Sequence, residues 1–206
     1  MVQLLPLSPS QRGLWYAQVL NPDVPFITAQ YLEFRGSLDH GLVTEAMLQA
    51  ARDVESGFLF LADGDGIPEQ FVDIEYVDDV PYVDCREFDD PEAAAHRWMT
   101  ARFSAPLDPL GDRLIASTLL HIADNRYFLS SYVHHIALDG HGAMILLSRA
   151  AELYSAWIAG EGTPPVTSLP IEKIIEFETT YVGSKRQAGD REHWASALQI
   201  FPSHSH

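Results

Sequence analysis

Two adjacent stretches of β-forming residues constrain the fold of this 206-residue chain most strongly. Residues 113–122 and 127–134 are rich in branched and aromatic side chains, and only the polar segment 123–126 separates them, which is typical of a β-hairpin. An apolar stripe with helical spacing follows at 143–159. A hairpin followed by a long amphipathic helix must bury one sheet face beneath that helix. The chain is therefore expected to form an α/β layer structure.

Helix-capping residues divide the rest of the chain into further elements. Ser8 and Asp39 each precede an apolar helical pattern, and Pro91 follows Asp90 at the first helical position, where the missing N–H of proline is harmless. The sequence predicts helices near 9–20, 40–54, 91–102, 171–182 and 187–198, and strands near 27–35, 80–84 and, as a pair, within 57–77.

The segment from Gly160 to Pro170 reads as a linker because it contains glycine at a helix end and several prolines. We therefore expect one lobe over residues 1–170. Residues 171–206 are expected to form a helical segment, and its last residues, IFPSHSH, are expected to be disordered.

Charge and composition exclude several classes of function. The chain carries 29 acidic and 13 basic residues, giving a net charge of −16, whereas binding to nucleic acid or to anionic membranes needs clustered Lys and Arg. No stretch is long and apolar enough to span a membrane, and the N-terminus lacks the features of a signal peptide. The single cysteine, Cys85, cannot form an internal disulfide, which fits a cytoplasmic protein.

The stretch from Tyr132 to Gly140 carries the residues suited to chemistry. A strand ends in His134 and His135, and a short loop returns Asp139 and Gly140 just before a helix. Adjacent side chains of a strand point to opposite faces, so one histidine should face a site and the other the interior. Free N–H groups at the helix start suit a developing oxyanion, and a histidine beside them has the parts needed for acyl transfer.

Two other interpretations of these histidines must be weighed. A His-His pair in a strand is more often structural than catalytic. His134, His135, Asp139 and His141 are also possible metal ligands, but strand alternation separates the first two, and we assign no metal site.

Residues 134–140 match the HHxxxDG signature of nonribosomal peptide synthetase condensation domains without a departure. Residues 8–15 (SPSQRGLW) resemble the opening motif of that family, although Ser10 replaces the usual alanine and Arg12 lies one position early. The order of elements also follows the family, so the chain resembles the N-terminal half of a condensation domain.

The resemblance implies a chloramphenicol acetyltransferase-like mixed-sheet sandwich that forms one lobe of a two-lobed fold. Donor and acceptor carrier proteins would deliver their substrates on phosphopantetheine arms, and no cofactor would be bound directly. His135 would orient or deprotonate the acceptor amine, with His134 and Asp139 in support and Gly140 supplying backbone near the tetrahedral centre. Asp139 would hold the loop by a salt bridge.

The second family motif is only partly kept, in residues 52–60. Arg52 and Phe60 match the family, but Gly57 stands at the position of a second arginine. Arg52 therefore remains a candidate partner for Asp139.

The length implies further expectations, because a whole condensation domain is about twice as long. Without its C-terminal lobe the fragment is expected to be inactive, or nearly so, and its exposed lobe interface could drive self-association. A motif so near Met1 suggests that the donor arrives in trans. Similarity to a siderophore synthetase suggests a role in siderophore biosynthesis.

Two alternatives remain open. His135 and Asp139 also satisfy the shorter HxxxD pattern of CoA-dependent acyltransferases. The lobe could instead be a non-catalytic module that only docks a carrier protein.

Overall fold

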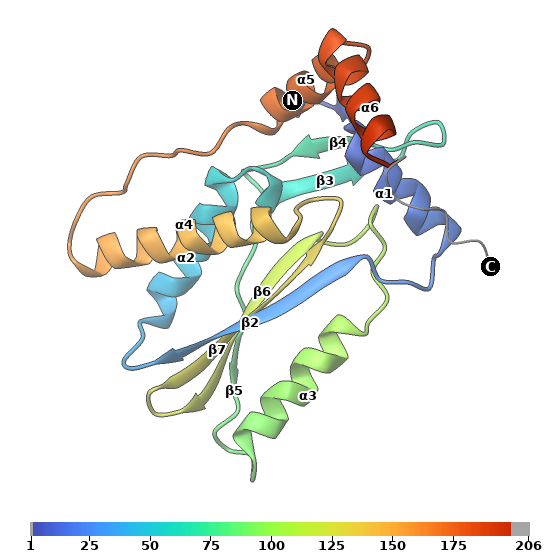
Figure 1. Ribbon diagram of the computed structural model, residues 1–206. Helices are drawn as coiled ribbons and strands as arrows, with labels where there is room; N and C mark the ends of the chain where they lie inside the picture. Colours follow the sequence, from blue (N-terminus) through green and yellow to red (C-terminus); the bar gives the residue numbers. More distant parts are fainter. Residues whose placement is uncertain (1, 199–206) are drawn as a thin grey trace.

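The computed structural model describes residues 2–198 (Figure 1), so the expected disorder of the last residues lies outside the described part. The main sheet has the strand order β2-β7-β6-β5. Strands β2 and β6 pair antiparallel with β7, whereas β5 pairs parallel with β6, which makes the sheet mixed, as predicted. These strands are β2 (Ile27–Arg35), β5 (Tyr82–Asp84), β6 (Ile115–Ala123) and β7 (Arg126–His134).

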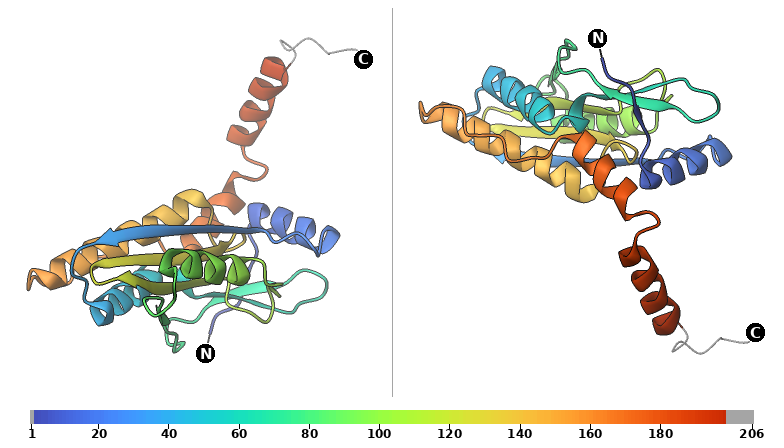
Figure 2. Two further views of the ribbon diagram at one scale, coloured as in Figure 1. Left: turned by 90° about the horizontal axis from the view of Figure 1, so that it is seen from below. Right: turned by 90° about the horizontal axis from the view of Figure 1, so that it is seen from above.

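Helices cover both faces of the main sheet (Figure 1; Figure 2). Because side chains alternate along a strand, Leu129 of β7 packs against α2 (His40–Asp53) and α4 (Gly140–Ile158). The preceding residue, Phe128, packs on the other face against α3 (Pro91–Phe103). The hairpin of β6 and β7 is therefore buried on both sides, which explains its continuous apolar sequence.

A smaller antiparallel sheet has the order β1-β4-β3 and consists of β1 (Leu5–Pro6), β3 (Leu59–Ala62) and β4 (Glu69–Val72). A short 3-10 turn (Ser56–Phe58) leads into β3. The pair β3–β4 lies within residues 57–77, where the sequence predicted two strands. Strand β1 was not predicted, because two residues that include a proline give no alternation signal.

Capping residues set the starts of the helices, as the sequence predicted. Ser8 and Gln11 form a reciprocal capping box at the start of α1 (Pro9–Leu20), and Asp39 and Asp90 cap α2 and α3. The start of α4 differs from the prediction. Asp139 is its N-cap, so the helix begins at Gly140 and takes the glycines into its first turn.

The two C-terminal helices differ in how they are held. Helix α5 (Ile171–Tyr181) buries Ile171 and Ile175 in the core cluster that also contains Val133 and Leu59. Helix α6 (Lys185–Leu198) starts two positions before the predicted 187, has no buried residue and projects away from the lobe (Figure 2). The division of the chain into a lobe (1–170) and a separate helical segment (171–206) stays a prediction. Helix α5 packs into the core of the lobe.

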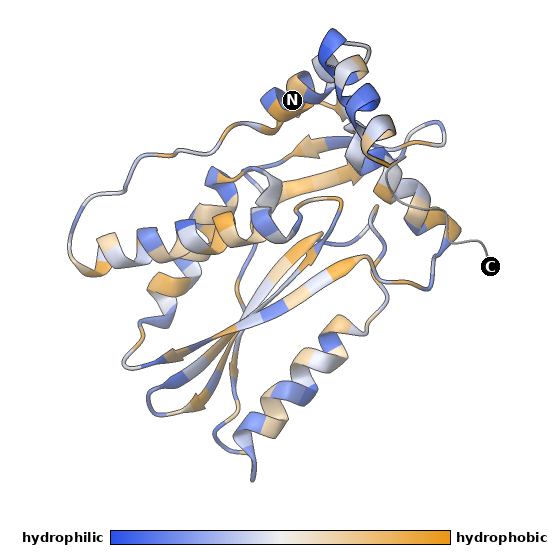
Figure 3. Cartoon of the chain, viewed as in Figure 1, coloured by the Kyte–Doolittle hydropathy of each residue, from blue (hydrophilic) through white to orange (hydrophobic). Residues whose placement is uncertain are grey.

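The hydropathy pattern agrees with these layers. Figure 3 shows β3 as largely hydrophobic, whereas α4 alternates between hydrophobic and hydrophilic residues, as expected for a helix with one buried side. None of the helices within residues 2–198 has both the length and the apolar character needed to cross a lipid bilayer.

A buried ion pair joins the two helices on the α2–α4 face. The guanidinium of Arg149 lies 2.7 Å from the carboxylate of Asp53, and the two side chains are only 8% and 6% exposed. Arg149 also donates to the backbone carbonyls of Pro164 and Pro165, so the same cation holds the linker against α4.

We expect Arg149→Met to lower the free energy of unfolding by about 3 kcal/mol, because it leaves the buried Asp53 carboxylate without its positively charged partner. Urea denaturation measures this change. Lys173→Met breaks the exposed pair with Glu176 and should change the midpoint little. If both variants unfold at the wild-type midpoint, the buried pair does not stabilise the helix layer.

Candidate functional site

The site lies where β7 ends and the chain turns into α4. The N–H of His134 donates to the carbonyl of Leu114 at 2.7 Å, and the N–H of His135 donates to the carbonyl of Phe26 on the opposite side at 2.8 Å. The backbone therefore keeps its alternation through both histidines. The His134 side chain is buried at 1% exposure, whereas His135 is half-buried. The prediction that the two histidines point to opposite faces, with one in the interior, is confirmed, whereas a site in front of His135 stays a prediction.

The hydrogen bonds of His134 define its protonation. Its Nδ1 accepts from the N–H of Ile136 at 3.2 Å, so the proton is on Nε2, which donates to Oε1 of Gln18 at 3.3 Å. Burial, and to a lesser extent the neighbouring His135, lower the pKa of His134 to about 4. His134 is therefore neutral at pH 7 and is held in one tautomer.

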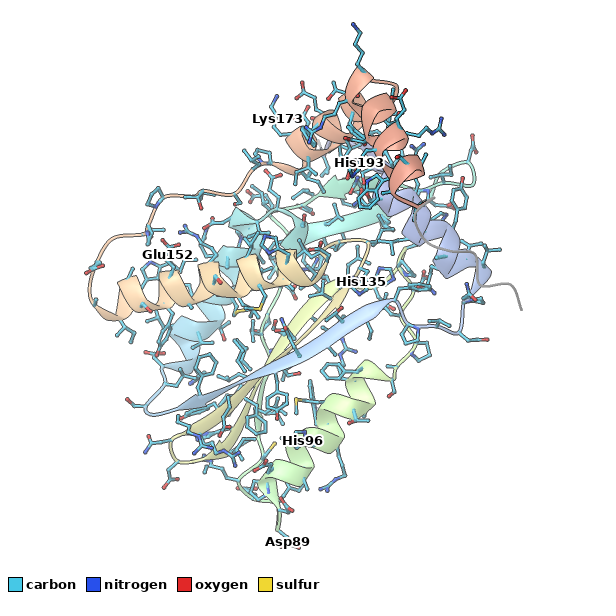
Figure 4. All side chains as sticks on the ribbon, in the orientation of Figure 1. Asp89, His96, His135, Glu152, Lys173 and His193 are labelled. Atoms are coloured by element: carbon cyan, nitrogen blue, oxygen red, sulfur yellow. The ribbon has the colours of Figure 1, made fainter. Side chains whose placement is uncertain are left out.

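The imidazole of His135 meets a hydroxyl on the neighbouring strand. Its Nε2 lies 2.9 Å from Oγ1 of Thr28, which is on β2 and pairs in register with Val133. Figure 4 shows His135 near the end of the main sheet, where β2 begins and α4 starts. The hydroxyl can donate to an Nε2 without a hydrogen or accept from one that carries it, so the contact is possible for either tautomer of the ring.

Asp139 is held differently from the expectation. Its Oδ1 accepts from the N–H of Gly142 at 2.8 Å as the N-cap of α4, and no ion pair to it occurs within residues 2–198. Arg52 donates instead to the carbonyl of Ile74 at 3.2 Å. The expected pair between Arg52 and Asp139 is therefore not formed. The positive end of the α4 dipole compensates the Asp139 carboxylate in place of a guanidinium.

The helix start leaves backbone donors beside the loop. Asp139 satisfies the N–H groups of Gly142 and Ala143, so within the described chain the N–H groups of Gly140 and His141 have no protein acceptor. A Cβ at residue 140 would meet no atom within 4 Å, which leaves this peptide open to a ligand. Gly142 has a packing role that the sequence did not reveal, because a Cβ there would lie 2.7 Å from Leu138.

The metal interpretation finds no support in the geometry. Within residues 2–198, no group of three or more His, Cys, Asp and Glu side chains is arranged to hold a metal ion. Both ring nitrogens of His134 are already hydrogen-bonded to the protein.

Sequence reasoning missed three residues that contact the two histidines or their loop, namely Thr28, Gln11 and Gln18. Thr28 is one β-former among several in its strand, and a contact across 107 positions leaves no local spacing signal. Gln11 lies within the opening motif, which was the one available sign that α1 serves the site.

Comparisons with known proteins agree with this geometry. The profile of the condensation-domain family matches residues 1–205. A dimodular nonribosomal peptide synthase of Bacillus subtilis (strain 168) is 32% identical over 198 residues, which cover 95% of this chain and 8% of that protein. Enterobactin synthase component F of Escherichia coli (strain K12) is 28% identical over 206 residues, covering 98% and 16%. The expected similarity to a siderophore synthetase is confirmed by this match.

Solved condensation domains share the fold. The starter condensation domain of rhizomide synthetase, a double mutant in complex with C8-CoA and Leu-SNAC, aligns with a TM-score of 0.90 at 27% identity over 97% of this chain. The first condensation domain of the CDA synthetase aligns with a TM-score of 0.83 at 25% identity over 98% of this chain. The match spans 46% and 52% of those two chains, so this chain spans about half the length of the solved domains. The chain belongs to the condensation-domain family of nonribosomal peptide synthetases and has the mixed α/β fold of its N-terminal lobe.

Proposed function

We propose that this lobe joins a carrier-bound acyl or peptidyl thioester to a carrier-bound amine, with His135 handling the proton of the amine. The supporting observation is the half-buried imidazole at the end of β7, whose Nε2 lies against a neutral hydroxyl, that of Thr28. Condensation domains are acyltransferases that act on phosphopantetheinyl thioesters, and this chemistry needs a proton acceptor but no bound cofactor.

In the proposed reaction the amine nitrogen attacks the thioester carbonyl, and its proton passes to Nε2 of His135. The tetrahedral centre then collapses, the C–S bond breaks, and the proton leaves with the thiolate. Thr28 occupies the side of Nε2 that an amine must approach, so it would hold the ring in place until the substrate arrives. Thioesters react readily with amines, so holding the two reactants together would contribute much of the rate.

The carbonyl oxygen gains negative charge in this step. The free N–H groups of Gly140 and His141 lie at the start of α4, where the helix dipole favours negative charge. We assign Gly140 this backbone role. Asp139 supports it indirectly, because its cap fixes the start of the helix. His134 supports the loop as a buried neutral residue, and Arg52 is not included in the site.

The proposal extends to partners and setting. A donor carrier protein, arriving in trans, and an acceptor carrier protein would reach the site from opposite sides. The site would be enclosed between this lobe and the C-terminal lobe, so residues 2–198 alone would have little or no activity and could self-associate through the open face. A siderophore pathway is proposed from the similarity to enterobactin synthase component F. The buried thiol of Cys85 fits a reducing cytoplasm, and burial raises its pKa.

A second candidate is a CoA-dependent acyl transfer at the same histidine. It is favoured by one observation, namely that the rhizomide synthetase starter domain was solved in complex with C8-CoA. The two candidates are distinguished by comparing the rates of acyl transfer when the same acyl group is offered on CoA and on a carrier protein. A faster reaction with the carrier protein supports the condensation reaction, and a faster reaction with CoA supports the second candidate.

We expect His135→Ala to lower amide formation by about 10²–10⁴-fold when it is measured in a complete condensation domain with loaded carriers, because a proton acceptor is lost. His193→Ala serves as a control, since that side chain is exposed on α6 and takes no part in the proposed reaction. An intact His135→Ala domain that keeps nearly the full rate would exclude a proton-transfer role.

We expect Thr28→Val to lower the rate about tenfold at low acceptor concentration, whereas Thr28→Ser keeps most of it, because only the first variant loses the hydrogen bond that holds the imidazole in place before the amine replaces it at Nε2. Single-turnover mass spectrometry of the condensed product measures both. Equal rates in the two variants would show that the hydroxyl does not orient the imidazole.

Stability should fall as the pH is lowered from about 6.5 to about 4, because unfolded His134 binds a proton there that the buried ring does not bind. The loss attributable to His134 should reach at most about 3 kcal/mol. Urea denaturation at several pH values in this range gives the free energy of unfolding as a function of pH. This free energy should change less steeply with pH in His134→Gln than in wild type, whereas His141→Gln, at an exposed position, should keep the wild-type dependence. If His134→Gln shows the same pH dependence of stability as wild type, protonation of His134 does not cause the loss.

A further inference from the structure

Helix α1 contacts the histidine loop at two points. Gln11 donates from Nε2 to the carbonyl of Ile136 at 2.9 Å, and Gln18 accepts from Nε2 of His134 at 3.3 Å. The two glutamines are seven positions apart, or about two helical turns, so they lie on one side of the helix. Because His134 and Ile136 flank His135, this side of α1 holds both neighbours of the proposed catalytic residue.

Gln11 is itself fixed by a second, fully buried amide. Gln70, in the middle strand of the small sheet, is 0% exposed. Each of the two side chains donates from Nε2 to the Oε1 of the other at 2.7 Å, so their amides form a reciprocal pair. Gln70 also donates to the carbonyl of Pro6, and Gln11 accepts from the N–H of Ser8.

The hydrogen-bonding capacity of the pair is almost fully used. Gln11 uses both hydrogens of its amide nitrogen and both acceptor positions of its oxygen, all with protein partners. Reversing its amide would place oxygen against the carbonyl of Ile136 and nitrogen against the N–H of Ser8. The network therefore permits one orientation only, and that orientation directs a donor at the loop.

The backbone of the loop after β7 is also restricted by hydrogen bonds of its own. The N–H of His135 is bonded to Phe26, the N–H of Ile136 is bonded to Nδ1 of His134, and the carbonyl of Ile136 is bonded to Gln11. Ile136 is only 2% exposed, so water does not readily replace a lost partner of its carbonyl. Gln11 thus holds the loop through the carbonyl of Ile136, whereas the main sheet holds it through the N–H of His135.

We propose that Gln11 and Gln70 are positioning residues, and that their paired amides set the placement of His135 from outside the HHxxxDG segment. Neither touches the reacting atoms. The catalytic consequence rests on the proposed function, whereas the placement of the ring can be measured without any reaction.

Gln11→Met, Gln70→Met and the double variant test the proposal. The tautomer ratio of His135 is read from long-range ¹H–¹⁵N spectra of the ¹⁵N-labelled chain, with its signals assigned by their loss in His135→Ala. We expect each single variant to shift this ratio about fivefold toward that of free imidazole, because a loop without the bond from Gln11 to Ile136 holds the ring less firmly against Oγ1 of Thr28. Gln49→Met is the matched control, because Gln49 is a half-buried glutamine that bonds Asp53 within α2.

The double variant separates positioning from stability. Replacing both amides by apolar groups of similar shape should restore part of the stability lost in either single variant. The tautomer ratio should nevertheless stay shifted, because the donor to Ile136 is still absent. In a complete domain, kcat should fall about fivefold in Gln11→Met with KM unchanged.

Two results would overturn the proposal. One is a wild-type tautomer ratio in folded Gln11→Met. The other is a double variant in which both the stability and the tautomer ratio of His135 return toward the wild-type values, since the two glutamines would then have only a structural role. If Gln70→Met does not fold, Gln11→Met still decides, because Gln11 is half-buried on a surface helix. A failure of the proposed function would instead appear as an active His135→Ala domain with the ratio still dependent on Gln11.

Discussion

The alternation of side chains at the end of β7 is the constraint on which the site depends. His134 is buried and neutral, with both ring nitrogens bonded to the protein. Because the backbone still pairs on both sides at this point, the next side chain must emerge on the opposite face. His135 therefore reaches its half-buried position beside Thr28 as a consequence of where His134 is held. Burial of one imidazole thus places the other.

The layers of the lobe keep that strand end in position. The hairpin of β6 and β7 is covered by α2 and α4 on one face and by α3 on the other, and the chain enters α4 directly after the histidines. The Asp139 cap completes the start of α4 without an arginine. On the remaining side, α1 and the small sheet meet the loop through Gln11 and Gln70. The site is therefore held by several layers, although its signature occupies one short segment.

The sequence predicted the elements whose signals are local. The hairpin, the capped helices and the opposed histidines follow from periodicity and capping chemistry, and the structure agrees with them. Strand β1, the Thr28 contact and the Gln11–Gln70 pair depend on segments that are distant in the chain and leave no periodic pattern. The pairing of Arg52 with Asp139 was wrong because a motif match gives residue types but no distances. The N-cap already satisfies Asp139, and Arg52 is bonded to Ile74.

Membership of the condensation-domain family and the geometry of the loop lead to one central claim, that the acceptor amine meets Nε2 of His135. The most direct measurement is a crystal structure of a complete domain containing this lobe, bound to an acceptor analogue that keeps its free amine. The account predicts the amine nitrogen within about 3 Å of Nε2, on the side where Thr28 now lies. An amine bound out of reach of this imidazole, with His135 still bonded to Thr28, would contradict it.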